Sequence, residues 1–210
     1  ARCSQIAVVA AYEAVEDAKL DLALEDPTRM GVVMGTGVGG QDMFVDMIQS
    51  GISANRMRSR PVDVINGLPN MPAFHISNVF GTRGPLNTVV TACAAGTQAI
   101  GVGTEEIRRG ATDVMLVGGV EAMITPVFFA TFEAMRAVTT QNDEPAHASR
   151  PFDASRDGFV IGEGAAFTGM MRQLGGSFGI AIITTFITRF TQEHRVNLVS
   201  HLDTSKLEVQ

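Results

Sequence analysis

Short apolar runs alternate along the chain with stretches in which apolar residues recur at helical spacing. Runs rich in β-branched residues indicate buried strands, whereas the periodic stretches indicate amphipathic helices. We therefore predict helices over Ser4–Leu20, Gln41–Gln49, Pro72–Phe80, Ala95–Arg109 and Ala130–Ala137. We predict strands over Met30–Met34, Asn87–Ala92, Thr112–Val117 and Gly158–Ala166, with Gly118–Gly119 ending the third strand, and polar irregular segments over Ser53–Pro69 and Thr139–Asp157. This alternation predicts an α/β fold with a mostly parallel sheet covered on both faces.

A glycine-rich turn follows the first predicted strand. Gly35, Gly37 and Gly40 match the spacing G-x-G-x-x-G, which is typical of dinucleotide-binding turns. Such sites also need a second strand that ends in an acidic residue roughly 20 residues later. The corresponding segment, Asn55–Pro61, does not have the pattern of a strand. We favour a close-packed backbone turn, with a nucleotide site as the alternative.

Cys93 lies where the second predicted strand meets a helix. A thiol at the start of a helix points at free backbone N–H groups, whose partial positive charge favours the thiolate and so increases nucleophilicity. A lone cysteine is also often a buried structural residue. The local pattern fits both interpretations, a nucleophile and a core residue.

Composition and charge narrow the classes of function. The chain has 210 residues, of which 45% are hydrophobic, and a net charge of −6. This charge argues against broad nucleic-acid binding but is compatible with a small basic patch for an acidic partner. The only cysteines, Cys3 and Cys93, form neither a disulfide framework nor a zinc cluster, which fits a cytoplasmic protein. We predict no metal site and no cofactor. Because no Met precedes Ala1, we expect the true N-terminus to lie upstream.

Four segments together resemble one enzyme family. They are Thr91–Thr97, Gly118–Pro126, Ser149–Asp153 and Arg156–Gly164. In residue content and spacing they resemble the type I/II beta-ketoacyl carrier-protein synthases of fatty-acid and polyketide synthesis. The resemblance covers about residues 4–169, which would be most of the N-terminal half of such an enzyme.

The resemblance implies a fold and a reaction. It implies a thiolase-like α/β fold, here incomplete, with a mixed sheet covered by helices. Cys93 would be the nucleophile that accepts an acyl group from the phosphopantetheine arm of an acyl carrier protein, before decarboxylative condensation with malonyl-carrier protein. Covalent catalysis of this kind splits one difficult reaction into two easier steps. The backbone N–H of Cys93 would be one donor of the oxyanion hole.

Four further residues take roles only through the resemblance. Val38 and Phe132 match positions that line the acyl pocket, with turn filler and core packing as the alternatives. Arg58 and Arg136 match basic positions that dock the acidic carrier protein, with ordinary surface charge as the alternative. Arginine suits the phosphate and carboxylates of such a partner. The stretch Pro85–Ala92 matches a strand that pairs across a homodimer axis, so we expect a homodimer.

The resemblance ends near Gly169. Residues 170–210 resemble a segment of a drug-efflux transporter of the major facilitator superfamily, and we predict a separate, helical tail there. Its apolar stretch, Leu174–Ile187, is shorter than the roughly 20 residues that a membrane span needs. We favour a fusion accident, an assembly error or a frameshifted end, with a membrane tether as the alternative, and we expect membrane contact only if the tail is genuine.

In the family, the second half of the enzyme supplies two histidines and a lysine to the reaction. The histidines of this chain lack the motif context of a Cys–His pair; they are His75, His147, His194 and His201. Asp157 and Glu163 match positions that hold structural acids in the family. We therefore expect very slow or no decarboxylation of malonyl-carrier protein by this chain alone. The alternative function is a non-catalytic relic or a module that binds carrier protein without turnover.

Overall fold

The computed structural model describes residues 1–23, 25–54, 60–171 and 180–183, and within them one mixed sheet has the strand order β2-β1-β3-β4-β5. The strands are β1 (Met30–Gly35), β2 (Leu86–Val89), β3 (Val114–Glu121), β4 (Gly164–Met171) and β5 (Ile180–Ile183). The helices are α1 (Arg2–Asp17), α2 (Gln41–Ser53), α3 (Pro61–Asn66), α4 (Met71–Phe80), α5 (Ala95–Arg108) and α6 (Pro126–Ala134), and short 3₁₀ helices are η1 (Pro27–Arg29), η2 (Ala92–Ala94) and η3 (Pro145–His147). The α/β class and the mixed sheet covered by helices are confirmed.

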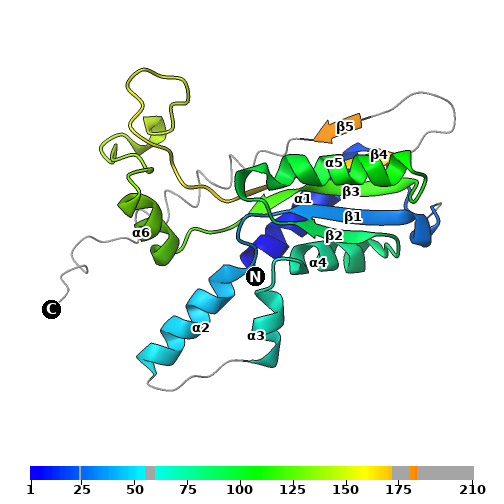
Figure 1. Cartoon of the computed structure of the whole chain (residues 1–210), viewed down its shortest axis with the longest axis horizontal. Coiled ribbons are helices and arrows are strands. Elements are labelled where there is room, and N and C mark those ends of the chain that lie inside the picture. Colours follow the sequence, from blue (N-terminus) through cyan, green and yellow to red (C-terminus); the bar gives the residue numbers. More distant parts are fainter. Residues whose placement is uncertain (24, 55–59, 172–179, 184–210) are drawn as a thin grey trace.

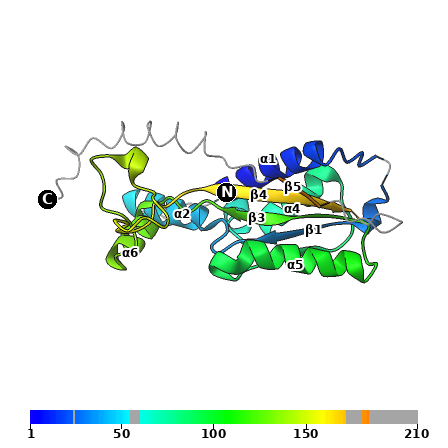
Figure 2. The same ribbon diagram turned by 90° about the horizontal axis from the view of Figure 1, so that it is seen from above.

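Helices cover both faces of the sheet. α1 and α4 lie on one face and α5 lies on the other, so that the sheet forms the middle of three layers (Figure 2). The larger apolar core lies between the sheet and the pair α1 and α4, and the smaller core lies under α5. Alternate side chains of β1 and β3 point into the two cores, which is why both strands are apolar on both faces.

Three strands run parallel, and their carboxyl ends meet at one edge of the sheet. β1 pairs in parallel with both β2 and β3, and its last residue, Gly35, lies beside Val89 and Gly119. α2 and α6 extend beyond this edge (Figure 1). Ligands of open α/β sheets bind outside the carboxyl ends of the strands, so the loops at this edge are the place to look for chemistry.

α5 lies unusually close to the sheet because glycines face it. A Cβ at Gly103 would lie 2.2 Å from the Cγ1 of Val117, and a Cβ at Gly119 would lie 3.0 Å from the Cα of Gly96. The first distance is shorter than real Cβ contacts and the second is tighter than most, so α5 packs its backbone against the Val117 side chain and against the backbone of β3 at Gly119. One prediction is thereby corrected: β3 does not end at Gly118–Gly119 but continues to Glu121, because Gly119 makes room for α5 and Gly118 makes room for β4, and neither terminates the strand.

Other boundaries also differ from the prediction. The last strand before the tail covers 164–171 and not 158–166, because it follows the antiparallel pairing with β3 from Glu121 back to Val114. The segment Ser53–Pro69, predicted to be irregular, contains α3. The backbone N–H of Arg60 donates to the Asp63 carboxylate over 3.0 Å and so stabilises the start of this helix. α6 starts earlier than predicted because Thr125 caps it and Pro126 takes its first position.

Part of the predicted tail lies in the sheet. β4 continues past residue 169 to Met171, and β5 pairs with it in antiparallel fashion, with Ala181 opposite Gly169. Where the structure describes residues 170–210, they are therefore strand and not the predicted helix. The remaining tail residues, including His194 and His201, lie outside the described residues, and the division of the chain at residue 169 stays a prediction.

Asp157 closes the long polar loop between α6 and β4. Its carboxylate accepts hydrogen bonds from the hydroxyl of Thr139 and from the N–H of Thr140, the latter over 3.0 Å. The hydroxyl of Thr139 and the N–H of Thr140 lower the pKa of Asp157 from its ordinary value of 3.8 to about 2. Asp157 thus acts as the structural acid that the sequence predicts.

Two glycines of α5 provide a matched test of the helix–sheet contact. Gly103→Ala should lower the free energy of unfolding by about 1–3 kcal/mol, because the new Cβ meets Val117. Gly101→Ala should raise it by roughly 0.5–1 kcal/mol, because beyond the backbone of α5 itself no heavy atom of the described residues lies within 4 Å of a Cβ there and alanine favours the helix. Urea denaturation of both variants measures the difference. Equal effects would show that α5 does not depend on this contact.

Loop closure by Asp157 should depend on pH. The lowered pKa means that the stabilisation is fully present above about pH 4 and is lost as the pH falls towards 2. The free energy of unfolding of Asp157→Asn should therefore be lower than that of the unmodified chain at pH 6, and the gap should shrink between pH 4 and pH 2. Urea denaturation across this range measures the gap. Asp143→Asn is the control, since it removes one charge from the same loop but none of these hydrogen bonds. A gap that stays constant with pH would contradict the argument.

Candidate functional site

Cys93 lies on an exposed turn at the carboxyl edge of the sheet. It is the middle residue of η2, which connects β2 to α5, and its side chain is exposed. The chain turns sharply just before it, at Ala92, whose φ of +50° is in the left-handed region that a residue with a Cβ rarely adopts. Strained turns of this kind occur at functional sites more often than elsewhere. Cys93 thus lies at the predicted strand–helix junction, and the structure does not place it in the core.

Gly35 determines where this turn lies. A Cβ at Gly35 would lie 2.2 Å from the carbonyl oxygen of Ala95 and 2.3 Å from its carbonyl carbon. The first turn of α5 therefore rests directly on the end of β1, and only glycine allows that approach. Since Cys93 lies two residues before Ala95, the same contact places the thiol above the carboxyl end of β1.

The glycine-rich turn after β1 is held by a carboxylate from β3. Glu121 accepts hydrogen bonds from the N–H of Gly37 over 2.7 Å and from the N–H of Val38 over 3.2 Å. The hydroxyl of Thr36 also donates to it over 3.2 Å. These are the donors that a bound phosphate would need, and a carboxylate already fills them. The close-packed turn is therefore the better interpretation, and the nucleotide site is disfavoured.

A mainly apolar hollow of about 380 Å³ lies beside the turn. Val38 lines it, together with Val90 from the segment that leads to Cys93. The other lining residues come from the glycine-rich turn, from α2 and from the end of α3: Gly37, Gln41, Phe44, Val45, Ile48, Gly67, Leu68 and Pro69. Because Gly37 packs against Ala92, the hollow and the thiol are neighbours.

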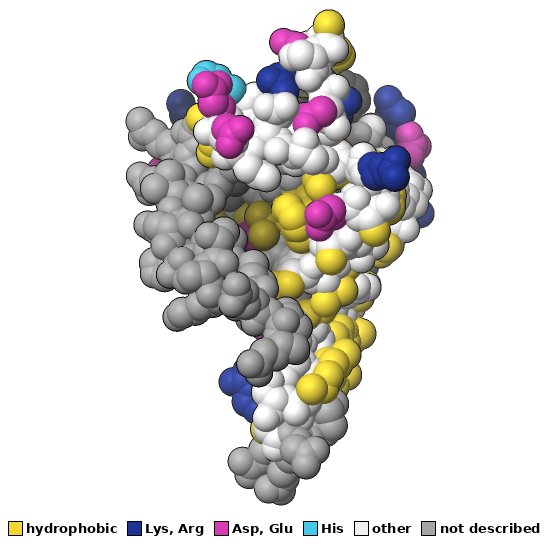
Figure 3. Space-filling view, turned by 90° about the vertical axis from the view of Figure 1, so that its left-hand side faces the viewer, with side chains coloured by type: hydrophobic (Ala, Val, Ile, Leu, Met, Phe, Trp, Pro, Cys, Tyr) yellow, Lys and Arg dark blue, Asp and Glu magenta, His cyan; other side chains and the backbone are white. Residues whose placement is uncertain are grey.

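Apolar side chains continue from the hollow along α2 and α3. These two helices form an arm that projects from the sheet, and yellow side chains run along it in Figure 3. Ile52 is 74% exposed and Val62 is 51% exposed. An arm that exposes this much apolar surface is typical of a contact surface.

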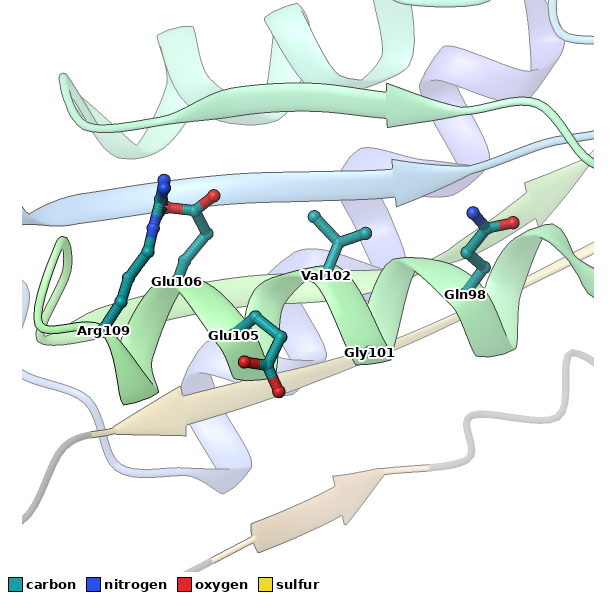
Figure 4. A pocket seen from close by; sticks show the side chains of 6 residues that line it. All are labelled: Gln98, Gly101, Val102, Glu105, Glu106 and Arg109. Carbon is teal, nitrogen blue, oxygen red and sulfur yellow. Dashed lines mark hydrogen bonds and ion pairs between the residues drawn. The ribbon is translucent and has the colours of Figure 1, made fainter.

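A second hollow, of about 400 Å³, lies along the outer face of α5 (Figure 4). All of its lining residues come from that single helix: Gln98, Gly101, Val102, Glu105, Glu106 and Arg109. Glu106 and Arg109 form an ion pair with each other. This hollow contains no nucleophile, and we assign no chemistry to it.

The other predicted site residues lie apart from the apolar hollow. Phe132 is half-buried on α6 and packs edge-to-face against Phe159, with ring centroids 5.6 Å apart. Arg136 is exposed just after α6, and no acidic side chain of the described residues forms an ion pair with it. Arg58 lies outside the described residues. The structure thus places Val38 in a hollow that Val90, three residues before Cys93, also lines, and Phe132 is not among the residues that line it.

Neither histidine of the described residues is an evident partner for Cys93. His75 lies on α4, which covers the face of the sheet opposite α5, and burial lowers the pKa of His75. His147 is exposed in η3. In the described part of the chain no three His, Cys, Asp or Glu side chains gather as they would to hold a metal ion.

Sequence reasoning missed Glu121 as a site residue. The signal was present, because an acid that follows a buried apolar strand and two glycines must find donors at the end of that strand. Its partner loop could not be identified without the pairing of β1 with β3.

Comparisons with known proteins agree with this geometry. The family model described as beta-ketoacyl synthase, N-terminal domain, matches residues 1–173. The 3-oxoacyl-[acyl-carrier-protein] synthase 2 of Staphylococcus aureus is 43% identical over 164 residues, which are 78% of this chain and 40% of that protein. The tetracenomycin polyketide synthase ketoacyl synthase alpha subunit of Streptomyces glaucescens is 38% identical over 208 residues, which are 94% of this chain and 49% of that protein. The chain thus spans less than half the length of these curated relatives.

A solved structure shows the same fold. The structure is described as a type II polyketide synthase acyl-carrier protein in complex with its ketosynthase bound to the hexaketide. One chain of this complex superposes on the present chain with a TM-score of 0.74 at 28% identity. The superposition covers 84% of this chain and 46% of that chain. The thiolase-like fold is thereby confirmed. The relatives reported above are synthases, so the resemblance of residues 170–210 to a transporter stays a prediction. In the described residues, no helix is long and apolar enough to cross a membrane.

The two cysteines should differ strongly in reactivity. Cys3 is fully buried in α1, and burial, with a smaller effect of the nearby Asp42 charge, raises the pKa of its thiol to about 11. Near pH 8, iodoacetamide should alkylate Cys93 at least about tenfold faster than Cys3, because burial makes a thiol inert. Mass spectrometry of the two peptides measures the rates, and the urea-denatured chain, in which both should react alike, is the control. Equal rates in the folded chain would contradict the exposed position of Cys93.

Proposed function

The chain belongs to the beta-ketoacyl synthase family, and we propose that within it Cys93 is the acyl-accepting nucleophile of a condensing enzyme of fatty-acid or polyketide synthesis. The observation that supports this most directly is the exposed thiol on a strained turn, next to an apolar hollow lined by Val38 and Val90. The matched relatives include a 3-oxoacyl-[acyl-carrier-protein] synthase and a polyketide synthase subunit, so the proposal covers both fatty-acid and polyketide synthesis.

In the first step, the sulfur of Cys93 attacks the thioester carbonyl carbon of an acyl-phosphopantetheine arm. A new C–S bond forms to Cys93, the C–S bond to the arm breaks, and the sulfur of the arm takes up the proton that Cys93 loses. Negative charge develops on the carbonyl oxygen during this attack. The backbone N–H of Cys93, in η2 just before α5, is one donor for that charge.

The apolar hollow takes the acyl chain. Each methylene that moves from water into an apolar site contributes about 0.8 kcal/mol, so a few buried methylenes are enough to select for an acyl group. Val38 forms part of the wall of the hollow. Phe132, on α6, does not line this hollow, so its place beside the acyl chain is supported by the family resemblance alone. The family resemblance implies that the acyl chain then grows by decarboxylative condensation. The described residues offer no histidine pair for that step, so acyl transfer is the step that we assign to them.

An acyl carrier protein delivers the acyl group. Carrier proteins are acidic, and Arg136, exposed just after α6, together with Arg58, provides the positive charge that docks one. The structural neighbour that is complexed with an acyl-carrier protein supports this partner.

We also propose a homodimer formed through β2. β2 is the edge strand of the sheet, and among the described residues it pairs with β1 alone. Leu86, the first residue of β2, is 47% exposed, and Val90, which follows its last residue, is 51% exposed. An edge strand with exposed apolar side chains is a template for pairing with another chain.

Acyl transfer can be tested directly on the full chain. Incubation with a long-chain acyl-carrier protein should add the mass of the acyl group to the peptide that contains Cys93, and Cys93→Ala should abolish this addition. Intact-protein and peptide mass spectrometry measure it. Cys3→Ala is the control and should still accept the acyl group. Carrier-protein binding without any acyl addition would favour the non-catalytic binding module and overturn this proposal.

A further inference from the structure

One carboxylate organises the loop beside the proposed nucleophile. Both oxygens of Glu121 are used: Oε2 accepts the N–H of Gly37, and Oε1 accepts the N–H of Val38 and the hydroxyl of Thr36. The hydroxyl oxygen of Thr36 in turn accepts the N–H of Gly39 over 2.9 Å. One side chain thereby satisfies or orients four consecutive residues of a turn that has no regular secondary structure.

The charge of Glu121 has no cationic partner among the residues that the structure describes. It lies half-buried at the end of β3, and within the described residues no Lys, Arg or His forms an ion pair with it. Backbone and hydroxyl donors alone compensate its charge. Hydrogen bonds to a charged group are stronger than bonds between neutral groups, so this carboxylate determines the shape of the turn.

The turn, the carboxylate and the Cys93 segment pack as one unit. A Cβ at Gly37 would lie 2.9 Å from Oε2 of Glu121 and 3.4 Å from the Cα of Ala92. Gly37 is therefore enclosed between the carboxylate and the residue that precedes Cys93. Val38, the next residue, lines the apolar hollow, so any movement of the turn moves that wall relative to the thiol.

We propose that Glu121 is a positioning residue: its carboxylate holds residues 36–39 so that Val38 forms the wall of the acyl hollow at the correct distance from Cys93. Glu121 thereby sets how readily a long acyl group reaches the sulfur. This inference rests on the proposed function, because it concerns the substrate selectivity of the same site.

Glutamine cannot replace Glu121 in this role. A glutamine side chain has nearly the same shape but only one acceptor oxygen. Its NH₂ group would face the N–H of either Gly37 or Val38, so that one donor would lose its partner. The turn would then relax away from β3 without a large loss of core packing.

The test compares two alkylating reagents on the full-length chain. N-decyl iodoacetamide and iodoacetamide carry the same reactive group, but only the first must place an alkyl chain in the hollow. In Glu121→Gln the rate at which N-decyl iodoacetamide labels Cys93 should fall about tenfold, which corresponds to the loss of one such hydrogen bond. The rate with iodoacetamide should stay within about twofold, since Cys93 is exposed in either case.

A second variant and a control support the comparison. Gly37→Ala, at a position without positive φ, should produce the same selective loss, because the new Cβ displaces the carboxylate. Glu105→Gln, an exposed acid on α5 that pairs with Arg108, should change neither rate. Hydrogen exchange of the Gly37 and Val38 amides should speed up about tenfold in Glu121→Gln, which reports the loosened turn independently of any acyl chemistry.

The outcomes separate the inference from the proposed function. Unchanged rates in Glu121→Gln, or an equal fall with both reagents, would overturn the positioning role while Cys93 remains the acyl acceptor. If the unmodified chain reacts with iodoacetamide but shows no preference for the decyl reagent and takes no acyl group from carrier protein, the proposed function itself fails. Accelerated exchange at Gly37 and Val38 would in that case still support the hydrogen bonds of Glu121 but would overturn their link to acyl selectivity.

Discussion

The direct contact between the backbone of α5 and the ends of β1 and β3 is the constraint on which the candidate site depends. The carbonyl of Ala95 lies where a Cβ of Gly35 would be, and Gly96 faces Gly119 across the helix–sheet interface. A helix held by side chains could slide by a fraction of a side-chain length. A helix that rests on the main chain of two strands has no such freedom, and the thiol two residues before Ala95 inherits its position.

Two carboxylates then convert irregular segments into defined loops. Glu121 accepts hydrogen bonds from the glycine-rich turn, and Asp157 accepts them from Thr139 and Thr140 at the start of the long polar loop. Both loops carry backbone N–H groups that no strand or helix can satisfy. A carboxylate can accept several such bonds at once, so one side chain replaces the pairing that a neighbouring strand would otherwise supply.

The arrangement is compatible with the proposed acyl transfer. In that proposal the apolar hollow takes the hydrocarbon chain, the exposed turn gives a carrier access to the sulfur, and the backbone at η2 donates to the developing oxyanion. Each of these contributions comes from a different element, and the carboxyl edge of the parallel strands is where they meet. Family membership and this convergence support the same function from independent directions.

The sequence by itself determined the α/β class, the positions of β1 and α5, and the junction that carries Cys93, because these depend on local periodicity and on the β-branched run before the cysteine. It did not reveal that β3 continues through Gly118 and Gly119, because these glycines are needed for close contacts with distant elements, Gly118 with β4 and Gly119 with α5. It did not reveal Glu121 for the same reason, since the donors of its hydrogen bonds belong to a turn more than eighty positions away. The local sequence pattern specifies each helix and strand, but only the tertiary structure decides which of them lie close enough to form hydrogen bonds with one another. The candidate site depends on such contacts between elements that are distant in the sequence.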